Sequence, residues 1–332
     1  MIYYIKRIFK IDYRRMFKTI KKIAKRSNKS FIYIFYDVIK CSIKFGSGYM
    51  DYYCFSFEKL DNTQRATYIT RTVSNEYIKY LNDKNYYYIM QDKPTFLNTY
   101  KNYIKRDYLD LRNVTYDDFK LFIKKHQSFM AKPIDGLCGN GVELIDSSNY
   151  NSEELYKILI DKNQLLIEEL IIQHSKLNEL YPEAINTIRV VTCNINDNVS
   201  VLFKCLRMGN NGAHVDNFNH GGLFAPIDDD GIIRKPACDK DLNEYEVHPY
   251  TNTRIIGFNV PMMDEIYDMC FKMAKVTKEI AYCGFDIALS ENGPCVVECN
   301  EMPGYDLYQY YAHLEPKGMG LKPKFDKIIY NK

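Results

Sequence analysis

Acidic and amide side chains interrupt two apolar runs near the end of the sequence. The run "GFDIAL" contains Asp286, and "VVECN" contains Glu298 and Asn300. Residues two apart on a strand point to the same face, so Glu298 and Asn300 are expected to project together. Two carboxylates and one amide oxygen on adjacent strands suit a hard cation that also holds triphosphate oxygens. A capped strand end or a salt bridge would explain the same residues.

A glycine-rich segment, "KPIDGLCGNGV", follows a short apolar run. Lys132 could supply a point charge for phosphate oxygens, and Gly136, Gly139 and Gly141 could let backbone N–H groups approach them. The segment is not a Walker A loop, because the lysine precedes the glycines and a strand pattern follows them. A hairpin turn beside a surface lysine is the alternative explanation.

Three further segments carry charges at the ends or in the middle of strands. "QLLIEELI" contains Glu168 and Glu169 near its end, which could lie beside an adenosine or form an ordinary solvated strand end. Arg189, Lys204 and Arg207 occupy later strand patterns. An arginine that faces a cleft can grip carboxylate or phosphate with two hydrogen bonds, whereas a cross-strand ion pair is the simpler explanation for any one of them. No arrangement of the six histidines predicts a hydrolase.

These residues must be positioned by an α+β body built mainly on antiparallel strands. From residue 128 onward, short apolar runs alternate with Gly, Asn and Asp turns and predict strands, interrupted by helices at about 152–162 and 262–281. The first part of the chain predicts helices, over residues 1–45, around 62–82 and through 91–125.

Composition and charge limit the class of protein. The 332 residues carry a net charge of +3, but residues 1–44 hold 13 basic and two acidic residues, a local charge of +11 against −8 for the remainder. This favours a local anionic contact rather than nucleic-acid binding. The ten cysteines form no zinc-like spacing, and neither a signal peptide nor a membrane-spanning run is evident. We therefore expect a cytoplasmic protein with reduced thiols.

Taken in order, the segments resemble the ATP-grasp superfamily, and in particular its sugar-transfer-associated branch. The resemblance runs from about Asp92 to Gln309, through "DKPTF", "KPIDGLCGNGV", "LIEELIIQH", "INTIRVVT", "LRMGNNGAHVDNFNHGG", "HPYTNTRIIG", "CGFDIAL" and "VVECNEMPGYDLYQ". It implies an ATP-grasp fold, in which two α+β subdomains clamp ATP, preceded here by a basic and mainly helical segment. The expected divisions are 1–90, 91–172 for the nucleotide-binding subdomain, and 173–332 for the metal and substrate subdomain.

The resemblance also implies roles for individual residues. The nucleotide would contact Lys93, Lys132 and the 136–141 loop, with Glu168 to Ile171 against adenine and Glu169 near the ribose. Asp286, Glu298 and Asn300 would hold one or two Mg²⁺ ions, with Mn²⁺ as an alternative. The catalytic cations would be Arg189, Arg207 and Lys204. The acceptor side would be formed by Asp216, Asn217, Gly221, Gly222 and His248.

The implied activity is ATP-dependent joining of a carboxylate to an amine through an acyl-phosphate. The branch suggests a surface-polysaccharide precursor as substrate, such as an amino acid joined to a uronic acid, on a sugar-nucleotide or a lipid-linked glycan. Another ATP-grasp reaction, such as peptide-type ligation or phosphotransfer, and a non-catalytic nucleotide-binding assembly protein are the alternatives. Loss of metal ligands would indicate the last, and all of them are present.

The basic N-terminal segment, residues 1–44, has three interpretations. Its basic residues alternate with Ile, Phe, Tyr and Met, as in a helix that rests on the anionic inner face of a membrane. It could instead form an oligomer contact or a lid over an anionic sugar-nucleotide. A solvated helical face packed on the body is the third interpretation.

Overall fold

The computed structural model describes residues 12–134 and 141–330, and two compact units divide the chain. The first unit combines residues 1–80 with 304–332, and the second is formed by 81–303. Gly136 and Gly139 of the predicted phosphate loop lie outside the described residues. Among the described residues, no helix is both long and apolar enough to cross a membrane.

The first unit is helical, as the sequence predicts. Its longest helices are α2 and α3, and both begin at a side-chain cap: Asp12 accepts from the Arg15 N–H and Ser30 from the Tyr33 N–H. The helical elements of this unit are α2 (Tyr13–Ser27), α3 (Phe31–Phe45), α4 (Tyr49–Cys54), η1 (Phe57–Lys59), α5 (Asn62–Arg65), α6 (Arg71–Leu81), η5 (Asp306–Gln309) and α14 (Lys322–Tyr330).

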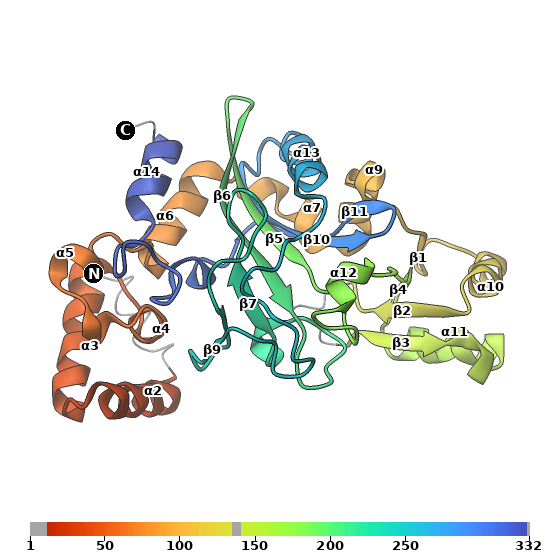
Figure 1. The fold of residues 1–332 in the computed structure, drawn as a ribbon. Coiled ribbons are helices and arrows are strands. Elements are labelled where there is room, and N and C mark those ends of the chain that lie inside the picture. The colour runs from red at the N-terminus through yellow and green to blue at the C-terminus, as the bar shows by residue number, and fades with distance from the viewer. Residues whose placement is uncertain (1–11, 135–140, 331–332) are drawn as a thin grey trace. The chain divides into compact units, whose positions relative to one another are not determined.

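The second unit contains two antiparallel sheets, which Figure 1 shows as the yellow-green strands and the larger green and blue group. The smaller sheet has the order β1-β4-β2-β3, and the larger has the order β11-β10-β5-β6-β7-β8-β9. The strands are β1 (Tyr108–Asp110), β2 (Ser128–Lys132), β3 (Glu143–Asp146), β4 (Leu166–Glu169), β5 (Ile188–Ile195), β6 (Asn198–Met208), β7 (Leu223–Pro226), β8 (Ala237–Cys238), β9 (Glu244–Tyr245), β10 (Tyr282–Ser290) and β11 (Gly293–Asn300).

Helices cover one face of each sheet, and the charged side chains around Glu168 and Asp286 lie on the other. Phe129, Ala131 and Ile167 of the smaller sheet pack into a core with α10 and α11. Val190 and Phe285 of the larger sheet pack into a second core with α7, α8, α9 and α13. The helical elements of the second unit are η2 (Lys84–Tyr86), α7 (Tyr88–Gln91), α8 (Lys93–Thr99), α9 (Lys101–Ile104), α10 (Tyr116–Lys125), η3 (Ser147–Asn149), α11 (Ser152–Asp161), α12 (Ser175–Asn178), η4 (Phe218–His220) and α13 (Met263–Met273).

Three of the predicted helices are longer than the helices observed. The helix expected over 62–82 is broken between α5 and α6, and the region 91–125 contains strand β1, which follows a left-handed residue, Lys105. The helix expected over 262–281 ends at Met273. Beyond it, the buried Thr277 accepts a hydrogen bond from the Tyr100 hydroxyl, and the β-branched residues of this stretch have a lower helix propensity. Strands β7, β8 and β9 are not predicted by the sequence pattern.

Candidate functional site

The smaller sheet holds a buried ion-pair cluster around Glu168. The Lys132 ammonium lies 3.0 Å from the Glu168 carboxylate, and the Arg106 guanidinium lies 2.7 Å from it. Lys132 and Glu168 share a face because Met130, two residues before Lys132, pairs with Glu168 across β2 and β4. Burial would raise the pKa of Glu168, but the two cations outweigh it and hold the pKa at about 2. Glu168 is therefore a carboxylate at neutral pH.

Arg106 is a site residue that the sequence does not predict. Its side chain is 2% exposed, and its Nη1 also donates to the Val296 carbonyl in β11 at 2.8 Å, which ties the two sheets together. The other terminal nitrogen, Nη2, is buried and has no hydrogen-bond partner among the described residues. No local pattern signals this role, because Arg106 and Glu168 are 62 residues apart.

The remaining predicted nucleotide residues lie near the ends of β2 and β4. The Lys93 ammonium donates to the carbonyls of Pro133 and Ile134, at 2.9 and 3.1 Å, where the chain leaves β2 toward the glycine segment. The carbonyl of Gly141, on the far side of that segment, accepts from Gln164 at 3.0 Å. Ile171 is half-buried just beyond β4.

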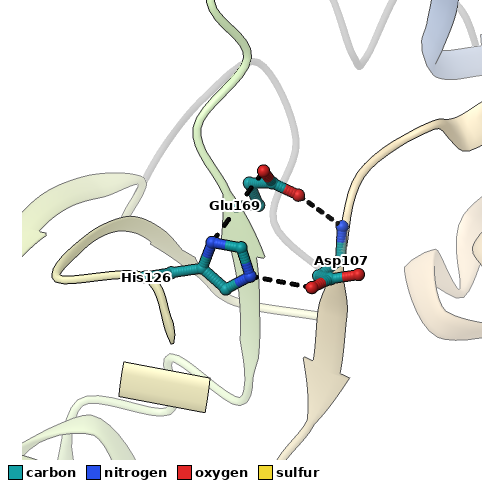
Figure 2. Close-up of side chains that lie close together, drawn as sticks. All are labelled: Asp107, His126 and Glu169. Atoms are coloured by element: carbon teal, nitrogen blue, oxygen red, sulfur yellow. Dashed lines mark hydrogen bonds and ion pairs between the residues drawn. The ribbon is translucent and has the colours of Figure 1, made fainter. Parts of the chain in front are cut away.

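Glu169 belongs to a separate cluster with Asp107 and His126, shown in Figure 2. His126 Nε2 lies 2.8 Å from Asp107, and its Nδ1 lies 3.9 Å from Glu169. The Asp107 N–H donates to Glu169 at 2.9 Å. One ligand atom from each residue could gather around a metal ion. However, the two carboxylates face different nitrogens of the His126 ring, and a metal ion can bind only one ring nitrogen. In this arrangement the three residues therefore form a hydrogen-bonded cluster.

The larger sheet assembles the predicted metal residues with two arginines. Asp286 pairs directly with Glu298 across β10 and β11, and with Arg189 across β10 and β5. The Arg189 Nη2 lies 2.7 Å from Asp286, and the Arg207 Nη1 lies 2.9 Å from it. Gly284 leaves the necessary room, since a Cβ there would lie 3.2 Å from the Arg189 side chain. Asp286 is thus shared by two cations.

Glu298 and Asn300 project to one face, and the Asn300 amide lies 3.4 Å from the Glu298 carboxylate. The pKa of Glu298 is raised to about 7, because protein atoms crowd the carboxyl group and Asp286 adds a negative charge beside it. Since the residue is exposed to solvent, the repulsion from Asp286 is the firmer of the two causes. The pKa of Asp286 moves the other way: burial would raise it, but Arg189 and Arg207 outweigh burial and lower it. The pair is therefore two close carboxyl groups, one of them held strongly ionised.

The predicted acceptor residues border the arginines. Asp216 is buried, accepts from the Thr187 N–H at 3.0 Å, and lies 3.2 Å from Arg207. The chain turns back directly after it: the Gly222 N–H donates to the Asn217 carbonyl, and a Cβ on Gly222 would lie 2.5 Å from the Asp216 carbonyl oxygen. Gly221, in the same turn, has a φ of +95°.

Two predicted residues lie apart from this group. Lys204 pairs with Val190, on the sheet face that packs against α13, and its ammonium lies 2.5 Å from Asp229. His248 is fully buried, and its Nε2 lies 2.9 Å from the Gly209 carbonyl. Burial lowers the pKa of His248, which favours the neutral ring.

The two antiparallel sheets, each with a cluster of charged side chains, and the helices packed on them form an α+β fold. This is the fold class that the sequence predicts. The sequence model of the sugar-transfer-associated ATP-grasp family matches residues 64–325, so the chain belongs to this family. The predicted α+β, ATP-grasp fold is confirmed. A search of curated proteins found none that matches.

Among solved structures, the fold is similar to the ATP-grasp ligase PsnB in complex with a minimal precursor, at 13% identity and a TM-score of 0.45, over 81% of this chain and 71% of that one. It is also similar to D-alanine-D-alanine ligase from Coxiella burnetii (10% identity, TM-score 0.43, 73% of this chain and 57% of that one). A third similar structure is biotin carboxylase from Campylobacter jejuni (11% identity, TM-score 0.46, 74% of this chain and 47% of that one). The chain thus spans less than two thirds of the latter two.

Proposed function

We propose that the chain is an ATP- and Mg²⁺-dependent ligase that joins a carboxylate to an amine through an acyl-phosphate. The observation that carries the proposal is the opposite charge of two clusters in one compact unit. Lys132 and Arg106 both contact a single carboxylate, Glu168, and Lys93 contacts the chain just beyond β2, whereas Asp286 and Glu298 face each other across two strands. The first arrangement suits an anion and the second a cation.

The nucleotide is proposed to lie along the smaller sheet, in the subdomain of residues 91–172. Lys132 would contact phosphate oxygens, and Lys93, which donates to the carbonyls of Pro133 and Ile134 just after β2, would add a second positive charge near them. Glu168 to Ile171 would lie against adenine and Glu169 near the ribose. Glu168 keeps Lys132 in place, since its low pKa makes it a permanent partner.

Asp286, Glu298 and Asn300, in the subdomain of residues 173–332, are proposed to hold Mg²⁺. The donor set fits, because carboxylate and amide oxygens are what this ion prefers, and because Asp286 still repels Glu298 in direct cross-strand register although Arg189 and Arg207 contact Asp286. When bound, the ion supplies charge that neutralises phosphate oxygens during transfer.

The chain's own residues then position and stabilise the reacting groups. A substrate carboxylate oxygen attacks the γ-phosphorus of ATP, and the bond to the ADP oxygen breaks. The amine lone pair next attacks the acyl carbon, phosphate leaves, and the amine loses a proton. Each arginine has five N–H donors, so Arg189 and Arg207 can bind the acyl-phosphate while they hold Asp286. Lys204 is left out of this step because it lies on the opposite face of β6.

The acceptor side is proposed to be formed by the turn from Asp216 to Gly222, and His248, which lies apart from this turn, would support the chain at Gly209. We expect two small substrates, a carboxylate and an amine. The expected pathway is the synthesis of a surface-polysaccharide precursor in the cytoplasm. A uronic acid and an amino acid are the pair to try first.

An ADP-release screen with paired amino acids and uronic acids, followed by mass spectrometry, tests the proposal. ADP release that needs both partners, with a product lighter by one water than their sum, supports it. A peptide product or a phosphorylated carboxylate would indicate another ATP-grasp reaction. ATP binding without turnover on any pair would indicate an assembly protein and overturn the ligase assignment.

A further inference from the structure

Helix α3 carries a stripe of apolar side chains on its solvent side. Ile32, Tyr36, Ile39 and Ile43 are 78, 67, 43 and 78% exposed, and their spacing places them along one helical face. Tyr33, at 51%, borders the stripe. An isolated exposed isoleucine is ordinary, but four apolar side chains over three turns form a continuous surface.

The opposite face of α3 is fixed in the interior of the first unit. Ile34, Val38 and Cys41 are buried there. Asp37, also buried, lies 2.7 Å from the Arg65 guanidinium and accepts from the Tyr52 hydroxyl at 2.7 Å. Because Asp37 is the only acid of α3, the solvent side of this helix has no negative charge, and its charged residues are Lys40 and Lys44.

Helix α2, which packs against α3, carries a strong positive charge. Phe17 of α2 lies 6.1 Å, between ring centroids, from both Phe31 and Phe35 of α3, which joins the two helices. The solvent side of α2 is basic: it exposes Arg14, Arg15, Lys18, Lys21, Lys22 and Lys25. Between residues 12 and 45 the chain has ten basic and two acidic residues.

We propose that α3 rests on an anionic lipid surface, with Ile32, Ile39 and Ile43 inserted below the headgroups. Tyr33 and Tyr36 would lie at the polar boundary, while Lys40, Lys44 and the basic residues of α2 contact the headgroups. A second copy of this chain is the less favourable occupant, because it would bring one strongly basic surface against another. The inference depends on the first unit alone and does not require the proposed ligase activity.

Vesicle co-sedimentation of the full chain tests the proposal. The probes are phosphatidylcholine vesicles with and without phosphatidylglycerol, at low and at high salt. We expect binding only to the anionic vesicles, weakened by salt. The triple variant Ile32→Asn, Ile39→Asn, Ile43→Asn should bind at least about tenfold more weakly, since each change removes apolar surface that would be inserted. Leu121→Asn is the matched control, since Leu121 is a 67% exposed apolar residue on α10 of the other unit.

Three results would overturn the proposal. In the first, the intact protein ignores anionic vesicles at low salt, and in the second, the triple variant binds them as the parent does. In the third, the parent is a dimer in ultracentrifugation, the triple variant is a monomer, and vesicle binding is unchanged, which would make α3 a self-association surface. ATP turnover should be the same in the triple variant and the parent, so failure here leaves the proposed function untouched.

Discussion

The two sheets of the second unit both place charged side chains on the face away from their helices, but with opposite balance. In the smaller sheet Arg106 and Lys132 share one carboxylate, Glu168. In the larger sheet Arg189 and Arg207 stand among three carboxyl groups, those of Asp286, Asp216 and Glu298. With every carboxyl group counted as ionised, each cluster contains one formal charge in excess, positive in the first and negative in the second.

The difference suggests what each sheet is prepared to bind. Unbalanced charge beside groups of the same sign is costly, and a ligand of the opposite sign would compensate it. The pKa values of the two glutamates agree with this difference in charge: that of Glu168 is held at about 2, whereas that of Glu298 is raised to about 7. In the smaller sheet Glu168 is already paired, and one cation is in excess. In the larger sheet a bound cation would favour the ionised form of Glu298.

The largest expected effect comes from Glu298→Gln. If the excess negative charge binds Mg²⁺, removing it should lower ATP turnover by at least about 100-fold, since a step that depends on metal charge loses about 3 kcal/mol or more. Turnover would be followed by ADP release and the fold by circular dichroism. Near-normal turnover in a folded variant would contradict the metal assignment.

The same variant should be more stable than the parent in metal-free buffer at alkaline pH. Because the pKa of Glu298 is raised in the folded state, the folded protein retains a proton that the unfolded chain releases, and stability falls as pH rises from about 4.5 to about 7. Glutamine removes this loss. Thermal melting in EDTA should give a higher Tm for the variant at about pH 8 and equal values near pH 4.5. A lower Tm at alkaline pH would argue against repulsion from Asp286.

The second effect concerns Arg207→Ala. It leaves Asp286 with one cation and the buried Asp216 with none among the described residues, so we expect a loss of about 3 kcal/mol in the free energy of unfolding. Where the variant is folded, turnover should fall more than ATP affinity. Arg207→Lys, which keeps the charge, is the control for stability. Equal loss of ATP affinity, with unchanged turnover of bound substrate, would exclude a role at the reacting centre.

Lys132→Ala probes the positive excess and should have a smaller effect. Glu168 retains Arg106 at 2.7 Å, so the fold should survive, while ATP affinity falls roughly tenfold through the loss of a phosphate partner. Calorimetry with a non-hydrolysable ATP analogue measures this. Lys162→Ala is the matched control, because Lys162, at the end of α11, pairs with Glu143 of β3 at 2.8 Å and both side chains are exposed. Unchanged affinity in Lys132→Ala would remove the lysine from the nucleotide site.

The smallest effect is expected from Lys204→Met. Lys204 is on the same strand as Arg207, but on the face that packs against α13. Turnover should stay within about twofold of the parent, and the apolar part of methionine should preserve the packing. A large loss of turnover with intact stability would restore the predicted catalytic role of Lys204 and break the distinction between the two faces.

The sequence by itself determined the main strands and the family. Strands such as β5, β10 and β11 are long, apolar and bounded by turn residues, and their two-residue period is enough to place Glu298 and Asn300 on one face. The helices are less well bounded by the sequence. A pattern that predicts a helix over 262–281 cannot reveal that Thr277 bonds to Tyr100, 177 residues away.

Only the tertiary structure decided which charges meet. Arg106 and Glu168 are 62 residues apart, and Arg189 and Asp286 are 97 apart. Their pairing depends on strand order and register, which no local pattern specifies. The same register separates Lys204 from Arg207, because three residues along a strand reverse the face. Local periodicity fixes the direction of a side chain relative to its own strand, whereas its partner is fixed by which strand lies beside it.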